Sequence, residues 1–219
     1  MKQCYLCGEP LKKNSNKSKD HTPPDSIFPN EKPKNLITIP CCIACNAEFA
    51  PIDEKMRNFF AILAGDKSGE IGKLAQNEVL TKKRLRQEFL SYTKEHPSLV
   101  DDNGKPRLIF YFKDEELKRW LIRLVKGLFY HHNKHRIDEK TTYRVKKHTD
   151  LLPQPSYTFP MERGLEFGPY FAYGVIQEEK TDFWVLIFYD HLMFSVTADF
   201  TSVNKMHNQL IQRTAFSRR

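Results

Sequence analysis

The sequence predicts an α+β protein, and three stretches carry that prediction. Residues 4–46 hold two Cys-x-x-Cys pairs around short β-branched segments, and residues 117–129 carry one continuous apolar stripe at helical spacing. From residue 141 onward, aromatic and β-branched residues dominate, as in strands. We therefore expect a small N-terminal module over residues 1–60. A helical region and a small antiparallel sheet should follow over residues 61–219.

Composition narrows the class of protein. The chain of 219 residues has a net charge of +8, which favours a polyanionic partner such as nucleic acid. No apolar run is long enough to span a membrane and no charged-then-apolar leader begins the chain, so we expect a cytoplasmic protein. Four of the five cysteines stand in pairs, which indicates metal ligands in a reducing compartment rather than disulfides.

The two cysteine pairs predict a structural metal site. Cys4 and Cys7 form the first pair, and Cys42 and Cys45 form the second. Two such pairs can bring four thiolates to one Zn²⁺ ion, which favours a tetrahedral all-sulfur site. A pairing of Cys41 with Cys45 is the alternative. We prefer Cys42, because its spacing matches the first pair, and we expect Cys41 to be a small buried residue.

Polar residues of catalytic type lie between and beside these pairs. The two prolines at 23–24 favour extended backbone, which places Asp20 and His21 on a short strand with their side chains on different sides. Residues 35–40 read as the returning strand of a hairpin. The second cysteine pair should open a helix. Asn46 would then face the hairpin, with its amide oxygen toward Asp20.

This combination resembles the HNH endonucleases of the ββα-metal superfamily, over about the first quarter of the chain. The resemblance implies a zinc-stapled hairpin and helix. Asp20 and Asn46 would bind a catalytic Mg²⁺ or Mn²⁺ ion, and His21 would be the general base. Asn35 corresponds to the asparagine that braces the loop in this family; a plain turn asparagine is an equally weighted alternative.

One position departs from the family pattern. Many members have a lysine or histidine three or four residues after the asparagine, where this chain has Phe49 and Ala50. Asp53 or Glu54 could take over part of that role, although an acidic residue on a helix surface is the preferred interpretation.

The remaining pattern predicts further elements without a motif of known chemistry. We expect helices over 53–64, 73–96 and from Asp114, strands over 108–112, 142–147, 167–177 and 183–197, and a basic disordered tail over 213–219. The helix from Asp114 has a polar face that carries Lys118, Arg119, Arg123 and Lys126.

A histidine cluster follows this polar face. His131 and His135 have the i, i+4 spacing that can bind a metal ion. No third metal ligand occurs at a sequence spacing typical of a metal site. Phosphate contact or capping of the helix C-terminus is therefore the preferred interpretation.

These observations predict a metal-dependent endonuclease that hydrolyses phosphodiester bonds in DNA, with RNA as the open alternative. An antiphage defence effector is one role for such a protein. The first alternative is a non-catalytic zinc ribbon that binds DNA. The second is a nuclease subunit that is active only with an ATPase or sensor partner.

Overall fold

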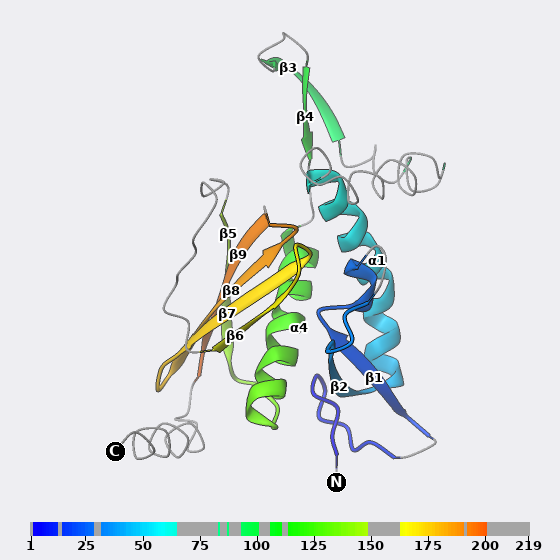
Figure 1. The fold of residues 1–219 in the computed structure, drawn as a ribbon, viewed down its shortest axis with the longest axis vertical. Coiled ribbons are helices and arrows are strands. Elements are labelled where there is room, and N and C mark those ends of the chain that lie inside the picture. Colours follow the sequence, from blue (N-terminus) through cyan, green and yellow to red (C-terminus); the bar gives the residue numbers. More distant parts are fainter. Residues whose placement is uncertain are drawn as a thin grey trace.

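A computed structural model describes residues 2–12, 15–28, 32–64, 83, 87, 93–100, 106–110, 114–148, 163–190 and 192–200. The predicted α+β class is confirmed (Figure 1). In chain order the elements are β1 (Lys17–Thr22), the short 3-10 helix η1 (Asp25–Ile27), β2 (Ile37–Cys42), α1 (Ile43–Ala64), β3 (Thr93–Val100), β4 (Pro106–Phe110), α4 (Asp114–Asn133), β5 (Thr142–His148), β6 (Arg163–Phe167), β7 (Phe171–Gln177), β8 (Thr181–Phe188) and β9 (Leu192–Asp199).

Strands β1 and β2 form the expected antiparallel hairpin, and α1 begins directly after β2. Asp20 pairs with Ile39 across the hairpin, and His21 pairs with Thr38. Adjacent residues of a strand point to opposite faces, so Asp20 is buried while His21 is half-buried on the other side. Strand β1 already begins at Lys17, which makes the preceding loop shorter than the polar composition of residues 12–19 indicated.

The C-terminal half of the described chain forms a five-stranded antiparallel sheet in the order β5-β9-β8-β7-β6. Figure 1 shows α4 between this sheet and the pair formed by the β1–β2 hairpin and α1. The predicted apolar stripe of α4 is confirmed, because it is buried along its whole length: Leu117, Trp120, Leu121, Leu124, Val125, Leu128 and Phe129. Within the described ranges, neither helix has the length and apolar character needed to cross a membrane.

One hydrophobic core joins the N-terminal hairpin to the sheet. Phe60 of α1 lies 5.6 Å from Trp120 of α4 and 4.8 Å from Phe188 of β8, measured between ring centroids. Ile37 and Ile39 of β2 belong to the same buried cluster. The predicted boundary near residue 60 therefore falls within α1, whose side chains contribute to this shared core.

Two predicted strands are each interrupted by a turn. The stretch 183–197 divides into β8 and β9, with Tyr189 and Asp190 at φ values of 53° and 57° between them. The stretch 167–177 divides where Gly168 takes a φ of 59°. A tyrosine in left-handed backbone is uncommon, so the composition offered no strong sign of the first turn.

The predicted helix over 73–96 is wrong at its C-terminal end. Residues 93–96 belong to β3, which pairs with β4 in a two-stranded antiparallel sheet. The pairing register shifts between His96 and Val100, the interval that contains Pro97. A proline lacks the N–H that a regular ladder uses, and an irregular register accommodates it. The rest of that predicted helix, apart from two isolated positions, and the predicted tail over 213–219 lie outside the described residues.

Helix α4 approaches the hairpin closely at Gly127. A Cβ atom built at this position would lie 2.4 Å from Thr22 Oγ1 and 2.8 Å from Ile39 Cδ1. Both neighbours are buried, so neither side chain has free space into which to turn. The absence of a side chain at position 127 therefore sets the spacing between α4 and the hairpin.

We predict that Gly127→Ala destabilises the protein by about 1–3 kcal/mol, because the new methyl group overpacks this contact. In an exposed helix the same change normally stabilises by about 1 kcal/mol. Urea denaturation followed by circular dichroism measures the difference. A gain in stability would show that α4 and the hairpin leave room for a methyl group at position 127.

Candidate functional site

Four cysteine sulfurs gather where the first turn of the chain meets the start of α1. The Sγ atoms of Cys4, Cys7, Cys42 and Cys45 all lie within 4.8 Å of one another, and those of Cys7 and Cys42 are 3.8 Å apart. A tetrahedral site with Zn–S bonds of about 2.3 Å has sulfur–sulfur edges of about 3.8 Å. The group therefore fits a metal ion such as zinc. The choice of Cys42 over Cys41 as the partner of Cys45 agrees with this geometry.

The fifth cysteine lies beside the cluster. The Sγ atom of Cys41 is 3.8 Å from that of Cys4, and both side chains are fully buried. The hydrogen bond from the Cys41 thiol lowers the pKa of Cys4 to about 3 and raises the pKa of Cys41 itself. Burial raises the pKa of Cys45. A thiolate at Cys4 is the form that a metal ion binds.

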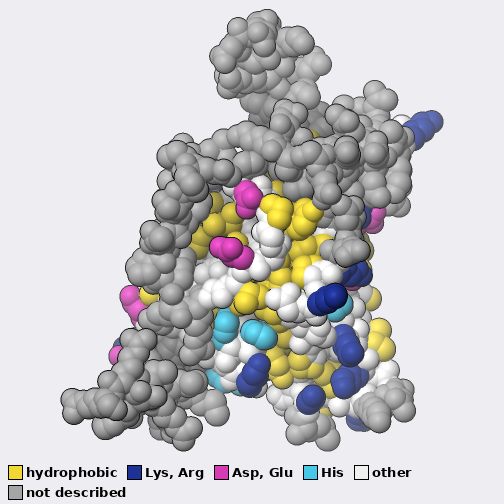
Figure 2. All heavy atoms as spheres, in the orientation of Figure 1, with side chains coloured by type: hydrophobic (Ala, Val, Ile, Leu, Met, Phe, Trp, Pro, Cys, Tyr) yellow, Lys and Arg dark blue, Asp and Glu magenta, His cyan; other side chains and the backbone are white. Residues whose placement is uncertain are grey.

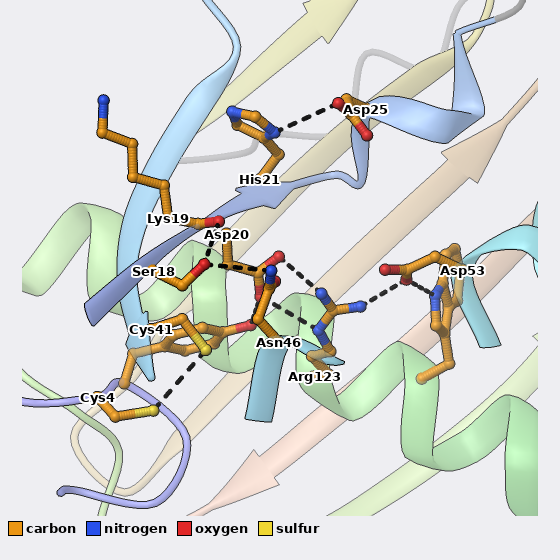
Figure 3. Close-up of polar contacts among 12 residues, drawn as sticks. Cys4, Ser18, Lys19, Asp20, His21, Asp25, Cys41, Asn46, Asp53 and Arg123 are labelled. Carbon is orange, nitrogen blue, oxygen red and sulfur yellow. Dashed lines mark hydrogen bonds and ion pairs between the residues drawn. The ribbon is translucent and has the colours of Figure 1, made fainter. Parts of the chain in front are cut away.

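Asp20 is buried and fully engaged by the protein (Figure 3). Arg123 of α4 donates from Nη2 to Oδ1 at 2.6 Å and from Nε to Oδ2 at 3.3 Å, and the Tyr5 hydroxyl donates to Oδ2 at 2.6 Å. A charge-assisted, two-point contact of this kind is among the stronger polar interactions in proteins. The carboxylate that the sequence assigns to a divalent ion therefore already faces a cation.

Arg123 also binds a second acid, Asp53 of α1, which accepts a further hydrogen bond of 2.8 Å from Trp120 Nε1. Burial disfavours the charged guanidinium, but Tyr5, Asp20 and Asp53 outweigh it and raise the pKa of Arg123. Burial raises the pKa of Asp53, although Arg123 opposes that effect. Asp53 thus forms part of an interhelical ion pair.

Asn46 lies on the side of β1 that carries Asp20, as expected. Its Nδ2 donates to Ser18 Oγ at 3.3 Å, and Ser18 is two residues before Asp20 on the same strand face. Figure 3 shows Ser18, Asp20 and Asn46 below the strand. The hydrogen bond uses the amide nitrogen of Asn46, whereas a metal ion would be bound by the amide oxygen.

His21 projects from the opposite side of β1, with Lys19 beside it (Figure 3). Its Nδ1 lies 3.7 Å from Asp25 Oδ2, and the side chain is 34% exposed. Asp25 also pairs with Lys32. His21 is therefore accessible from solvent and has a neighbouring carboxylate that can orient its ring.

The other candidate residues lie away from this group. Asn35 is exposed in the turn before β2, and Glu54 is exposed on α1. His135 packs edge-on against Phe129, with its Nδ1 3.0 Å from the carbonyl oxygen of Arg136. Across the described ranges, the four cysteines are the one group of three or more metal-binding side chains close enough to share an ion.

Sequence reasoning placed Arg123 on a polar helix face with Lys118, Arg119 and Lys126, and this was wrong for Arg123. Its side chain is 2% exposed. An arginine at that helical position gives no sign of burial, because the acids that receive it lie 70 and 103 residues away. Tyr5, inside the first cysteine pair, was also missed, because its partner Asp20 lies 15 residues further along the chain and no local pattern joins the two.

Comparisons with protein families, with curated proteins and with solved structures found no match to this chain.

We predict that Cys42→Ser removes the bound metal and unfolds the N-terminal hairpin, since structural zinc contributes on the order of 10 kcal/mol to small sites. Cys41→Ser is the matched control, because the neighbouring side chain is equally buried but lies outside the four-sulfur group. Metal content by plasma mass spectrometry and thermal unfolding report both effects. Loss of metal in the Cys41 variant alone would mean that Cys41 is the fourth ligand.

We predict that Arg123→Gln lowers the free energy of unfolding by about 3–5 kcal/mol, because it leaves the buried carboxylate of Asp20 and the largely buried carboxylate of Asp53 without their cation. Arg144→Gln is the control. Arg144 is 73% exposed and pairs with Asp199, and such surface pairs contribute about 0–1 kcal/mol. Equal effects of the two changes in urea titrations would contradict the assigned role of the buried pair.

Proposed function

We propose that this protein is a metal-dependent endonuclease of the HNH type. The observation that carries the proposal is the placement of His21, which is accessible on the outer face of a hairpin joined to α1 next to a four-cysteine cluster. Zn²⁺ is the ion we assign to that cluster. Its role is structural, because all four positions of a tetrahedral site would be filled by thiolates.

His21 is the general base in this proposal. The Asp25 carboxylate near Nδ1 orients the imidazole, which leaves Nε2 to accept a proton from the attacking water. A histidine is suited to this task because it exchanges protons near neutral pH. When bound, Mg²⁺ or Mn²⁺ would offset the charge that develops on the phosphate group.

Asp20 and Asn46 are the ligands we propose for that ion. Asp20 lies on the inner face of β1 and Asn46 lies in the first turn of α1 on the same side, and the Asn46 amide oxygen takes no part in the bond to Ser18. Ion binding at Asp20 would require its carboxylate to exchange at least one contact with Arg123. The proposal therefore includes a local rearrangement of this ion pair.

The surface around His21 suits a phosphate backbone. Lys17 and Lys19 are exposed and share its strand face, because residues two apart on a strand point the same way. Figure 2 shows Lys and Arg side chains gathered on the side of the molecule where Figure 1 places β1 and β2. We propose DNA as the substrate, with RNA as the alternative. Such contacts bind the backbone without reading the bases.

One observation favours a second candidate function, a non-catalytic nucleic-acid-binding module. The Asp20 carboxylate is engaged by Arg123 and Tyr5 at both oxygens, so a permanently closed pair would leave no acid for a catalytic ion. Cleavage that requires added divalent metal separates the two functions.

We predict that the purified, zinc-loaded protein nicks or linearises plasmid DNA when Mg²⁺ or Mn²⁺ is added, and that His21→Ala reduces the rate at least about 100-fold, in line with the usual contribution of a general base. Agarose gels over a time course provide the measurement. Samples without added metal are prepared by dialysis, because a strong chelator would also remove the structural ion.

His131→Ala is the matched control for this assay, since His131 is a half-buried helical histidine to which the proposed mechanism assigns no role. It should cut at the wild-type rate. Cleavage that persists in His21→Ala, or that proceeds without added divalent metal, would contradict the assigned mechanism. A folded protein that binds DNA without cutting it would support the second candidate.

A further inference from the structure

A cleft of about 920 Å³ opens on the side of α4 next to the cysteine cluster. Its walls come from four parts of the chain: the first cysteine knuckle, the start of α1, the polar face of α4 and strand β5. Cys7 and Cys45 border it, but His21 does not. It is therefore a feature separate from the proposed general base.

Cations outnumber acids among the residues that line this cleft. The lining contains two acids, Glu48 and Glu115. It contains five cations, four of them on α4 and one on β5: Lys118, Arg119, Arg123, Lys126 and Arg144. Along α4 the cations extend from position 118 to position 126, a rise of about 12 Å. An extended polyanion matches charges spread along a helix better than a single small anion does.

Most of these cations already have acidic partners, but the exposed pairs can be exchanged. Exposed ion pairs add little to stability, so a phosphate group can replace the carboxylate at small cost. Three pairs are of this kind: Lys118 with Glu115, Arg119 with Glu48, and Arg144 with Asp199. Arg123 differs, because it is buried with Asp20 and its second partner Asp53 is only 14% exposed, and we assign it no role in binding.

Two aromatic rings hold cations in position beside the cleft. The Arg119 guanidinium lies over the Phe49 ring at 5.0 Å, and Lys126 Nζ lies 5.6 Å from the centre of the Tyr143 ring. A guanidinium layered on a ring offers its other face to an unpaired nucleobase. Burial lowers the pKa of Lys126, and an anion bound beside it would favour the protonated form.

Strand β5 presents its edge to the cleft. Three consecutive residues line it: Tyr143, Arg144 and Val145. Because neighbouring residues of a strand point to opposite faces, all three can border the cleft only if it meets the edge of the strand. Among the described strands, the order also places β5 at the border of the five-stranded sheet, with β9 as its one partner. An edge strand of this kind can supply backbone N–H groups, which commonly bind phosphate oxygens.

We propose that this cleft binds an unpaired strand of nucleic acid through its phosphates and bases. Its volume is within the range of pockets that hold one drug-sized molecule, roughly 300–1,000 Å³, so it accommodates one or two nucleotides but not a duplex. The choice of nucleic acid over an acidic protein segment rests on the proposed function. The cleft would hold single-stranded substrate outside the region where His21 acts.

Fluorescence anisotropy with a labelled oligothymidylate, without added Mg²⁺, tests this proposal. We expect the double variant Arg119→Gln/Arg144→Gln to bind at least about 10-fold more weakly than wild type. The slope of log K against log salt concentration should become shallower by about 1.4. Each phosphate contact on a single strand contributes about 0.7 to that slope, and the variant removes two contacts.

The matched control is Lys140→Gln/Lys180→Gln, which removes two exposed cations that do not line the cleft. It should retain wild-type affinity. Circular dichroism and metal content verify that both double variants fold.

Three results would overturn the proposal: equal affinity of wild type and the cleft variant, an equal loss in the control, or tight binding of an acidic peptide with none of oligothymidylate. The plasmid assay is read separately. Oligothymidylate binding that depends on the cleft, in a protein that does not cut, would support the cleft and reject the nuclease. Plasmid cutting by the wild-type protein, together with oligothymidylate binding that is unchanged in the cleft variant, would support the nuclease and reject the cleft.

Discussion

The buried guanidinium of Arg123 is the contact on which the arrangement of the described elements depends. It joins the hairpin through Asp20 and helix α1 through Asp53, while the helix that carries it packs on the five-stranded sheet. A buried ion pair has to offset the loss of water around each charge, and it does so only with close hydrogen-bonding geometry. The Tyr5 hydroxyl and the Trp120 indole complete that geometry. The pair therefore specifies how three elements distant in sequence meet.

The alternation of side chains along β1 gives the hairpin two different faces. Asp20 and Thr22 point inward, against α4, where Gly127 permits close approach. Lys19 and His21 point outward, toward solvent. A shift of the hairpin register by one residue would exchange the two sets, exposing the acid and burying the histidine. The ion pair on one face thus fixes which residues the other face exposes to solvent.

The cysteine cluster and the cleft are connected through the same elements. Cys45 stands in the first turn of α1, so a metal bound there would set the position of Glu48 and Phe49 one turn later. Phe49 in turn supports the guanidinium groups of Arg119 and Arg123. Metal binding, the interhelical ion pair and the shape of the cleft are therefore physically linked, even though the proposed base lies on the other side of β1.

Local signals in the sequence determined much of the fold. The cysteine spacing predicted the four-sulfur group, and the two prolines and the β-branched segment predicted the hairpin. The apolar period predicted α4 from its first residue. These three predictions succeeded because metal-ligand spacing, proline sterics and helical periodicity act over a few residues. The turn at Tyr189 and strand β3 were missed because the residues there carry no strong local preference.

Tertiary structure decided the environment of the candidate site. The sequence placed an acid, a histidine and an asparagine near one hairpin, and it predicted opposite orientations for Asp20 and His21. It carried no sign that Arg123 would meet Asp20, since the two are 103 positions apart and an arginine on a helix is usually exposed. Whether a carboxylate faces an open position or a buried cation depends on how distant elements pack. The surroundings of the Asp20 carboxylate are therefore set by the packing of the whole core and not by the residues next to Asp20 in the sequence.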